Sequence, residues 1–517
     1  MPLTIGAYSI APKRVRRWVI LLASWAFFWA VSETLIVYLL ISIVLVHYFG
    51  LWLGALQTKS DALLKSAEAS EKKALKARCL KKQRLVMAGG VCINLGILLF
   101  LKYSPFFTAN INTLLAFLGT GISIEIPSYA LPIGISFYTL QALAYLFDVY
   151  RKKIPADTNI LRLALFMSFF PQIMEGPICR YSDTAERLWE ARPISYHNLT
   201  FGVQRICLGL AKKLIVADRL NLFIKNIFGN YANYDGCVIA VAIVFYTLQL
   251  YMDFSGTMDI ALGTGEIFGV SLPENFKRPF FSTSISEFWK RWHITLGTWF
   301  KDYVFFPISM AKPLKKLTIR ARKHLGNHFG PLVSGSIALF AVWLGNGLWH
   351  GAGWHYIFFG MYHFVLILLG NAIVPYAIKL CGKLNISRKG LPYRIFQIVR
   401  TSILVCIGEL FFRADNLIIA FGMLGKTLTN FNFSSFYDGT LLKCGMDGYD
   451  FIVILIVVLV LFAIGLIQEK GISIREAISK RNVVLRLCAY EALIIVIIVF
   501  GAYGTGYVAL DPIYAKF

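Results

Sequence analysis

Long apolar runs separated by short basic blocks dominate this 517-residue sequence. A run of about 20 apolar residues is long enough to cross the hydrocarbon core of a bilayer as a helix. Hydrophobic residues make up 57% of the chain and charged residues 15%, which excludes an ordinary soluble globular protein. Because the runs continue without a polar linker, we predict one all-α, polytopic membrane domain over residues 1–517 with about 10–12 transmembrane helices.

Basic residues lie in the short loops between the apolar runs. By the positive-inside rule these loops face the cytoplasm. The blocks are 13–17, 59–84, 151–153, 312–323, 379–400 and 470–486. The net charge of +24 therefore indicates orientation, and we expect no nucleic acid as a partner. Segment 59–84 has high helix propensity and predicts a charged cytoplasmic helix, whose cations could also contact anionic lipid headgroups.

Several shorter features are expected around these runs. Residues 32–34 should form the turn of a helical hairpin over 18–56. The short apolar stretch 161–170 predicts a re-entrant or interfacial element, and 201–216 is expected at the interface. The nine cysteines occur singly, so neither a zinc site nor a disulfide framework is indicated. No cleavable signal peptide is evident before the first apolar run.

The segment WLGNGLWHGAGWH at 343–355 contrasts most with its apolar surroundings. It lies in the region 331–372, where two apolar runs meet. An unsatisfied polar group in hydrocarbon costs on the order of several kcal/mol, so His350 is a candidate functional residue. The alternative is a structural histidine bonded to a carbonyl of a neighbouring helix. Glycines that would permit close approach of another group flank it. They are Gly347, Gly351 and Gly353.

The apolar run at 236–262 contains Asp253, Ser255 and Asp259. The two aspartates lie six residues apart and therefore point to different faces of one helix. We expect cations of the following segment to pair with them. Structural ion pairs inside a bundle are the stronger interpretation, and a functional role of Asp253 and Ser255 is the alternative.

Region 273–307 is aromatic and basic, and too charged for a lipid-facing helix. It predicts an interfacial amphipathic helix. If its central part is helical, Trp289, Trp292 and His293 share a face, because residues three and four apart are neighbours. His293 is a second candidate acid or base, or a residue that orients the site.

Two further polar groups stand next to apolar runs. Glu175 and Arg180 belong to a charged Gly-Pro turn that could equally be a helix terminator. Glu409 and Arg413 are spaced for a structural ion pair on one helix. A metal site is not expected, because His350 and its neighbour five residues on have no third ligand nearby. The remaining histidines, among them His363, are predicted to be surface or packing residues.

Seven stretches spread over most of the chain carry a family resemblance. They are LPIGISFYTLQALAYLFDVYR (131–151), MEGPICRY (174–181), YMDFSGTMDIALG (251–263), LPENFKRPF (272–280), EFWKRWHITLGTWFKDYVFFPI (287–308), GLWHGAGWHYIFFG (347–360) and ELFFRADN (409–416). Together they resemble the membrane-bound O-acyltransferase family, in its bacterial branch of alginate O-acetylation and D-alanyl transfer proteins. Two features depart from that branch: the short 1–10 stands where a full apolar segment is usual, and 59–84 is longer and more charged.

The resemblance implies a helical ring around a funnel, with His350 as the signature histidine and His293 as the supporting one. A histidine has the intrinsic pKa that a general base needs near neutral pH. We expect His350 to deprotonate an acceptor hydroxyl and His293 to position the thioester or tune His350; an acyl-histidine intermediate is the alternative. The residues expected to bind substrate or support the site are Trp289, Arg291, Trp292, Asn346, Trp349, Gly351, Asp253, Ser255, Glu175 and Arg180.

The implied activity is transfer of an acyl group, preferably acetyl, from a cytosolic thioester to a hydroxyl of a cell-surface or exported polysaccharide. The donor would be acetyl-CoA or an acyl carrier protein, with no bound cofactor. Expected partners are an extracytoplasmic acyltransferase or the polymer acceptor, in the lipid bilayer of a bacterial plasma membrane. D-alanyl transfer to teichoic acid is an alternative, although 272–276 and 511–517 look closer to the alginate branch. A transporter or flippase is the alternative of another class, but no inverted repeat is visible.

Overall fold

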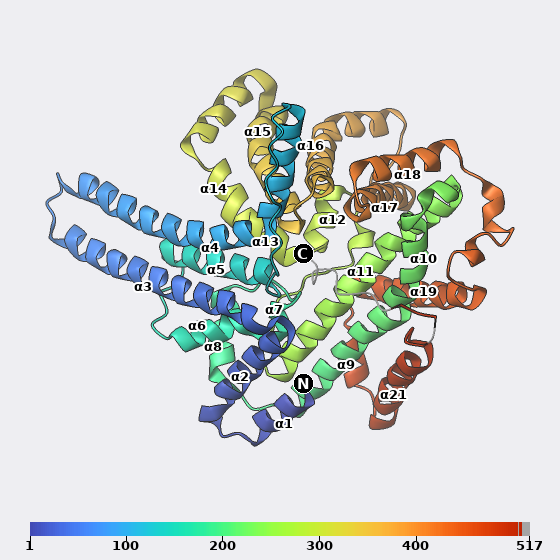
Figure 1. The fold of residues 1–517 in the computed structure, drawn as a ribbon, viewed down its shortest axis with the longest axis horizontal. Coiled ribbons are helices and arrows are strands. Elements are labelled where there is room, and N and C mark those ends of the chain that lie inside the picture. Colours follow the sequence, from blue (N-terminus) through green and yellow to red (C-terminus); the bar gives the residue numbers. More distant parts are fainter. Residues whose placement is uncertain (505, 509–517) are drawn as a thin grey trace. The chain divides into compact units, whose positions relative to one another are not determined.

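The computed structural model describes residues 1–504 and 506–508. Within these residues every regular element is a helix, apart from one isolated bridge between Phe276 and Trp292, so the all-α prediction is confirmed (Figure 1). The closing stretch 511–517 lies outside the described residues. The described chain divides into two compact units, 1–202 with 264–273, and 203–263 with 274–508. The single domain expected over 1–517 stays a prediction.

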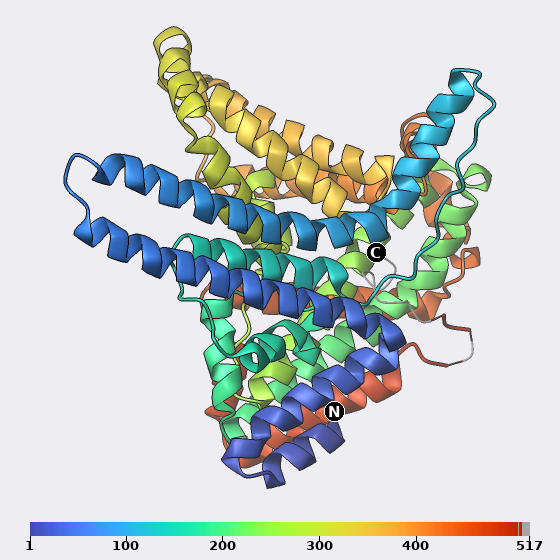
Figure 2. The ribbon, with the colours of Figure 1, turned by 60° about the vertical axis from the view of Figure 1, so that its left-hand side comes forward.

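The first unit consists of helices near the N-terminus. Its elements are α1 (Pro2–Ile10), α2 (Lys13–Ser32), the 3-10 turn η1 (Glu33–Leu35), α3 (Ile36–Ser66), α4 (Lys72–Phe117), α5 (Ile135–Tyr150), α6 (Ile160–Ser168), α7 (Phe170–Ile173) and α8 (Tyr181–Glu190). The turn η1 falls where the hairpin was predicted. Helices α3 and α4 run side by side, and α5 packs against both (Figure 2).

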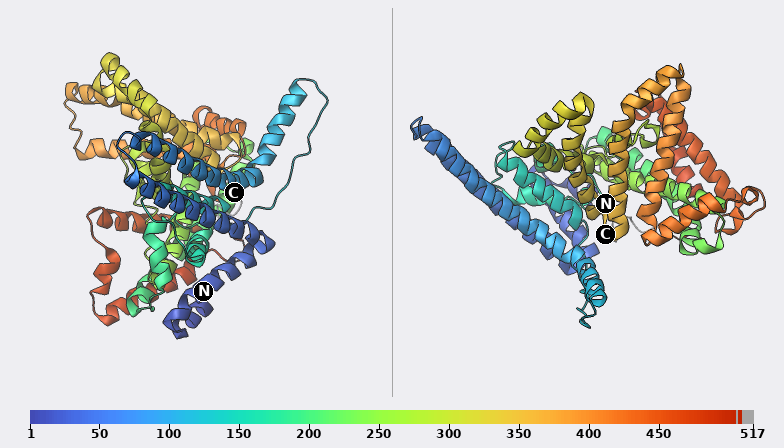
Figure 3. Two further views of the ribbon diagram at one scale, coloured as in Figure 1. Left: turned by 90° about the vertical axis from the view of Figure 1, so that its left-hand side faces the viewer. Right: turned by 90° about the horizontal axis from the view of Figure 1, so that it is seen from above.

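The charged segment 59–84 was predicted to be one helix. That prediction is wrong, because the segment forms the end of α3 and the start of α4. Ala67 has extended backbone angles, so α3 ends there, and a short turn leads into α4. Alanine, glutamate and lysine favour helix, and the turn contains neither glycine nor proline. Propensity alone therefore could not predict the break. The pairing of the two helices, including a buried hydrogen bond from Ser42 Oγ to Asn94 Oδ1 (2.7 Å), favours it instead. The left-hand view of Figure 3 shows these two helices lying side by side.

The second unit holds the longer part of the chain. Its elements are α9 (Tyr196–Ala211, which begins in the first unit), the π-helix η2 (Lys212–Ala217), α10 (Asp218–Gly229), η3 (Tyr231–Asn233), α11 (Gly236–Ile267, which ends in the first unit), η4 (Pro279–Phe281), α12 (Ile285–Arg291), α13 (Ile294–Phe300), the π-helix η5 (Lys301–Phe305), α14 (Phe306–Ser309), α15 (Lys312–His350), α16 (Trp354–Lys383), α17 (Leu391–Arg413), α18 (Leu417–Thr429), η6 (Phe433–Phe436), η7 (Leu441–Lys443), α19 (Gly448–Glu469), α20 (Ile474–Ser479) and α21 (Val483–Phe500).

Eight helical segments of the described chain are long and apolar enough to cross a membrane, which supports a multi-pass membrane protein. The first of them, Lys13–Ser66, contains both α2 and α3. The total is lower than the 10–12 expected, because several apolar stretches form short helices. The run predicted at 131–150 gives the 16-residue α5, and 161–170 gives the 9-residue α6. A helix rises 1.5 Å per residue, so about 20 residues are needed to span the hydrocarbon core.

Helix α15 is kinked at Gly326, which has non-helical backbone angles, and it packs closely against α16 in the second unit (Figure 2). A glycine of each helix stands where the two backbones meet. A side-chain carbon at Gly347 would lie 2.5 Å from the carbonyl oxygen of Tyr356, and one at Gly360 would lie 2.3 Å from that of Trp343. Only glycine permits this approach, which fixes the C-terminal turn of α15 against α16.

We expect Gly347→Ala to destabilise the protein, because the added methyl group must push α15 away from the α16 backbone. Gly335→Ala on the same helix is the matched control, since a side chain there meets nothing within 4 Å. In a helix, alanine is favoured over glycine by about 1 kcal/mol, so the control should be neutral or stabilised. The melting temperature of the detergent-solubilised variants measures this. Equal melting temperatures would contradict the proposed helix contact.

Candidate active site

His350 is the last residue of α15, and its side chain is 4% exposed. Its ring packs edge-on against Phe359 and Phe412, with centroid distances of 5.9 and 5.2 Å, and against Trp349 at 4.9 Å. The predicted glycine-rich break is present, because Gly351 and Gly353 are extended and separate α15 from α16. The histidine is therefore buried in protein at the end of a helix.

His293 lies between two short helices, not within one. Helix α12 ends at Arg291, Trp292 is extended, and His293 has the left-handed angles φ 47° and ψ 51° before α13 begins. The single helix considered for this region is therefore wrong, and so is the shared face. The ring of Trp289 packs 4.9 Å from that of Trp343, whereas the ring of Trp292 packs 5.1 Å from that of Phe276. A left-handed non-glycine residue costs about 1–2 kcal/mol, which surrounding contacts must offset.

Asn275 supplies those contacts. Its side-chain oxygen Oδ1 accepts hydrogen bonds from the backbone nitrogen and the hydroxyl of Thr295, both at 3.0 Å, and lies 3.3 Å from His293 Nδ1. Its backbone oxygen accepts from the backbone nitrogen of Ile294 at 3.0 Å. An amide oxygen cannot donate, so Nδ1 of neutral His293 carries the proton and Nε2 is the unprotonated nitrogen. The sequence reasoning missed Asn275, although it stands in the family-like stretch LPENFKRPF.

The two candidate histidines come together in the fold. The ring centroids of His293 and His350 lie 6.5 Å apart, and the ring of Trp349 is 5.6 Å from that of His293. The ring of Phe254 of α11 packs at 4.9 Å on His293. Residues 57 positions apart in the sequence thus form one buried cluster of imidazole and aromatic rings, as the candidate site requires.

Burial keeps His293 neutral. The side chain is 2% exposed, and this burial lowers the pKa of His293 to about 3. The desolvated positive form is disfavoured in an apolar environment. At physiological pH the His293 ring is therefore neutral and can accept a hydrogen bond at Nε2.

The other predicted residues of α15 lie close to His350 along the helix. Asn346 precedes it by one turn and is buried. Asn346 Oδ1 has no hydrogen-bond partner among the described residues. An unsatisfied buried acceptor costs about 1–3 kcal/mol, so this atom is suited to a substrate donor. Trp349 and Gly351 are the direct neighbours of His350, and the ring of Tyr356 occupies the space over Gly351.

Asp253 and Ser255 are buried in α11, on either side of the Phe254 that contacts His293. Asp253 pairs with Lys213 at 3.1 Å. Asp259 pairs with two further cations, Lys212 at 2.6 Å and Arg205 at 3.0 Å. These cations precede α11 in the chain, so the expectation that the following segment supplies them is wrong. The contacts agree with the structural interpretation of both aspartates, and a substrate role for Asp253 or Ser255 stays a prediction.

Arg291 and Trp292 hold the motif region in place. Arg291 lies 2.8 Å from Glu287 and 2.7 Å from Glu469 at the end of α19, and Arg278 shares Glu469 at 2.6 Å. Trp292 is buried against aromatic rings, among them Phe276 and Phe288. Both residues therefore support the segment that carries His293.

Four other predicted residues have different surroundings. Glu175 and Arg180 are buried in the first unit, and their part in the site stays a prediction. The ion pair predicted between Glu409 and Arg413 is not formed. Arg413 instead lies 3.9 Å from Asp415 and over the ring of Phe228, because its side chain points past the end of α17. Glu409 itself is 2% exposed.

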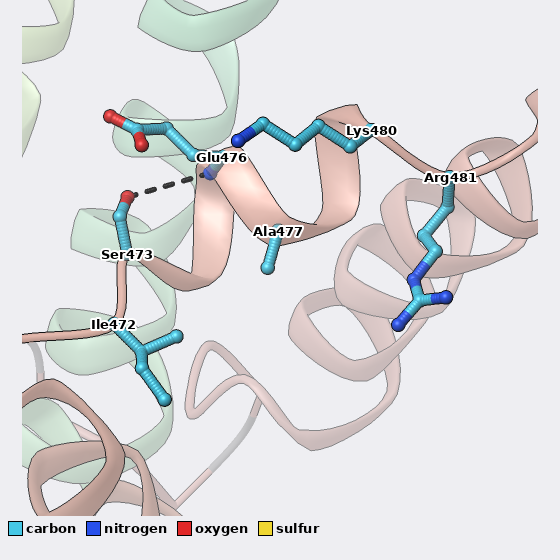
Figure 4. A pocket seen from close by; sticks show the side chains of 6 residues that line it. All are labelled: Ile472, Ser473, Glu476, Ala477, Lys480 and Arg481. Carbon is cyan, nitrogen blue, oxygen red and sulfur yellow. Dashed lines mark hydrogen bonds between the residues drawn. The ribbon is translucent and has the colours of Figure 1, made fainter. Parts of the chain in front are cut away.

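An open pocket of about 420 Å³ lies elsewhere in the second unit. Figure 4 shows its lining, which comes from the loop after α19 and from the short helix α20. The lining residues are Ile472, Ser473, Glu476, Ala477, Lys480 and Arg481. Ser473 accepts a hydrogen bond from the Glu476 backbone and so caps α20. None of the candidate active-site residues takes part, so this pocket is separate from the histidine cluster.

The pKa of His293 predicts how stability depends on pH. Its folded-state value of about 3 lies below the ordinary 6.5, so the unfolded chain binds the extra proton as the pH falls through 6.5. The neutral ring therefore makes its full contribution to the free energy of unfolding above pH 6.5. This contribution falls by about 1.4 kcal/mol per pH unit as the pH drops from 6.5 toward 3. We expect the melting temperature of wild-type protein to fall more steeply with acid than that of His293→Gln. Parallel curves would show that His293 is not buried neutral.

The chain is similar to one family model and to several known proteins. The family model described as membrane-bound O-acyltransferase matches residues 21–322. The "Probable alginate O-acetylase AlgI" of Pseudomonas syringae pv. tomato is 32% identical over 452 residues, covering 87% of this chain and 76% of the relative. The peptidoglycan O-acetyltransferase of Helicobacter pylori is 31% identical over 316 residues, 56% of each chain. The teichoic acid D-alanyltransferase of Bacillus subtilis is 31% identical over 293 residues, 53% of this chain and 67% of the relative. The chain is an acyltransferase that belongs to the membrane-bound O-acyltransferase family.

Proposed function

We propose that this acyltransferase moves an acetyl group from a cytosolic thioester to a hydroxyl of a cell-surface or exported polysaccharide. The observation that carries the proposal is the buried pair of imidazoles, His293 and His350, with ring centroids 6.5 Å apart. The relatives that match over most of the chain are alginate O-acetylases by name, which supports acetyl as the group and a polysaccharide as the acceptor. The location we propose is the plasma membrane of a bacterium.

His350 is the general base in this proposal. Its imidazole takes the proton of the acceptor hydroxyl as the oxygen attacks the thioester carbonyl carbon. The tetrahedral intermediate then collapses, the carbon–sulfur bond breaks, and the proton returns from His350 to the departing thiolate. The products are the O-acetyl ester and the free thiol. A positioned base of this kind contributes roughly 10²–10⁴-fold to the rate.

His293 has a different part. The hydrogen bond to Asn275 places its proton on Nδ1, so the neutral ring presents Nε2 as an acceptor. Such a ring cannot donate a hydrogen bond to an oxyanion from Nε2. It can orient a donor group of a substrate, or the N–H of His350 after proton transfer. We therefore assign to His293 the positioning of the reaction, and to backbone N–H groups at the glycine-rich break the stabilisation of the oxyanion.

The donor is proposed to be acetyl-CoA or an acetylated carrier protein, used as a substrate without a resident cofactor. An extracytoplasmic acyltransferase that completes the transfer, or the polymer itself, would receive the group on the other face. Transfer of D-alanine to teichoic acid is the second candidate, supported by the similarity to a relative of that name. A transporter role has no separate observation in its favour, because the aspartates of α11 are ion-paired.

We expect His350→Ala to lose acetyl transfer by about 10³-fold while it expresses and melts like the wild type, because only the base is removed. Purified protein in lipid vesicles, supplied with radiolabelled acetyl-CoA and polysaccharide, measures the transfer. Mass analysis of cell-surface glycans measures it in cells. His324→Ala is the matched control, since this histidine is exposed and lies before the kink of α15 at Gly326, far along the chain from His350.

Three results would decide against the proposal. Full acetyl transfer by His350→Ala would exclude the imidazole as the base. Incorporation of D-alanine from a charged carrier protein, without acetyl incorporation, would favour the second candidate. Loss of polymer export in His350→Ala without loss of acylation would favour transport.

A further inference from the structure

We infer that His363, through its hydrogen bond with Trp289, is a positioning residue that sets the spacing of His293 and His350. The inference rests on the proposed function of those two histidines. The sequence predicted no more than a surface or packing role for His363. The structure buries its side chain completely, at 0% exposed, in contact with the segment that carries His293.

A cluster of aromatic rings surrounds His363 on helix α16. Trp289 of α12 lies 4.9 Å from it, Trp343 of α15 lies 5.4 Å from it and Phe359 of α16 lies 4.8 Å from it, all as ring centroids. The ring of Trp289 also contacts Trp343 and Phe359 directly, at 4.9 and 6.0 Å. The cluster of Trp289, Trp343, Phe359 and His363 thus joins three helices through mutual ring contacts.

One hydrogen bond runs through this cluster. The indole nitrogen Nε1 of Trp289 lies 3.2 Å from His363 Nδ1. An indole N–H can only donate, so Nδ1 must accept, and neutral His363 carries its proton on Nε2. A phenylalanine or leucine at position 363 would fill the space but could not accept this bond. The bond therefore selects histidine at a position that is otherwise apolar.

The cluster connects the two candidate catalytic residues. Trp289 stands four residues before His293, and Trp343 stands two helical turns before His350 in α15. The ring of Phe359 contacts the rings of both His363 and His350. The hydrogen bond ties α12 to α16, and α16 is packed on α15, so a shift at this bond moves His293 relative to His350. Misplacement of reacting groups by about 1 Å can cost about 10²-fold in rate.

Helix α17 limits the movement of His363 from the other side. A side-chain carbon at Gly408 would lie 2.6 Å from His363 Nε2 and 3.2 Å from the ring of Tyr362. The His363 ring cannot move away easily, because Trp289 holds its other nitrogen. The absence of a side chain at Gly408 therefore leaves space for the His363 imidazole. Gly408→Ala should displace this ring without changing Trp289 or His363 themselves.

The test compares two tryptophan variants of the full-length protein in lipid vesicles. Trp289→Phe removes the indole N–H that donates to His363. Trp343→Phe removes the same atoms from the same cluster, but Trp343 makes no side-chain hydrogen bond among the described residues. We expect Trp289→Phe to lose more melting temperature than Trp343→Phe, because it leaves His363 Nδ1 buried without a donor. We expect kcat for acetyl transfer to fall about tenfold further in Trp289→Phe, with an unchanged KM for the donor.

The double variant Trp289→Phe/His363→Phe separates positioning from stability. It removes both polar partners together, so its melting temperature should recover relative to His363→Phe, which leaves the indole N–H buried without an acceptor. Its kcat should stay low. If kcat instead follows melting temperature across all these variants, including Gly408→Ala, His363 is only structural and the inference is overturned.

A second readout does not depend on the acceptor or the acyl group. Diethyl pyrocarbonate modifies exposed or mobile histidines, and mass spectrometry reports the rate at His350. We expect this rate to rise in Trp289→Phe above that in Trp343→Phe, because the support behind His350 is loosened. Equal rates would overturn the inference even if acetyl transfer proves not to be the reaction. If the wild type shows no acetyl transfer but the two variants differ in the rate of His350 modification, the result counts against the proposed function and not against this inference.

Discussion

An imidazole buried among aromatic rings must find its hydrogen-bond partners within the protein, because neither lipid tails nor bulk water reach it. For His293 the partner is the amide oxygen of Asn275, and for His363 it is the indole of Trp289. Each bond also determines which ring nitrogen carries the proton. The contacts that make burial tolerable thus decide which chemistry is open to each ring, and the rest of the site depends on them.

The sequence predicted those parts of the fold and the site that have a local signal. His350 stands out because an ionisable residue beside glycines is rare in an apolar run, and the 3-10 turn at 33–35 falls within one residue of the turn predicted at 32–34. The break at His293 has no such signal, since tryptophan and histidine are not turn residues. It depends on Asn275, 18 positions earlier, and on the bridge from Phe276 to Trp292. Pairings over that range are decided by tertiary packing, which local propensity does not encode.

The buried aspartates of α11 and the buried histidines have different surroundings. Asp253 and Asp259 face lysine or arginine directly and hold the π-helix η2 and α9 against α11. Breaking one partner of such a buried pair is strongly destabilising, by about 3–5 kcal/mol. The histidines His293, His350 and His363 are packed against aromatic rings instead. The ion pairs therefore join the helices of the framework, whereas the candidate site is built from imidazole and aromatic rings.

The interruption of the helices after His350 has an electrostatic consequence. Helix α15 ends there with its carbonyl groups, and α16 starts at Trp354 with its amide groups. The macrodipole gives a helix a partial negative charge at its C-terminus and a partial positive charge at its N-terminus, each about half an elementary charge. The negative end of α15 would stabilise a positive charge on the His350 imidazole. The positive end of α16 would stabilise a negative charge on a substrate oxygen. Three residues of backbone thus polarise the site along the direction in which acyl transfer separates charge.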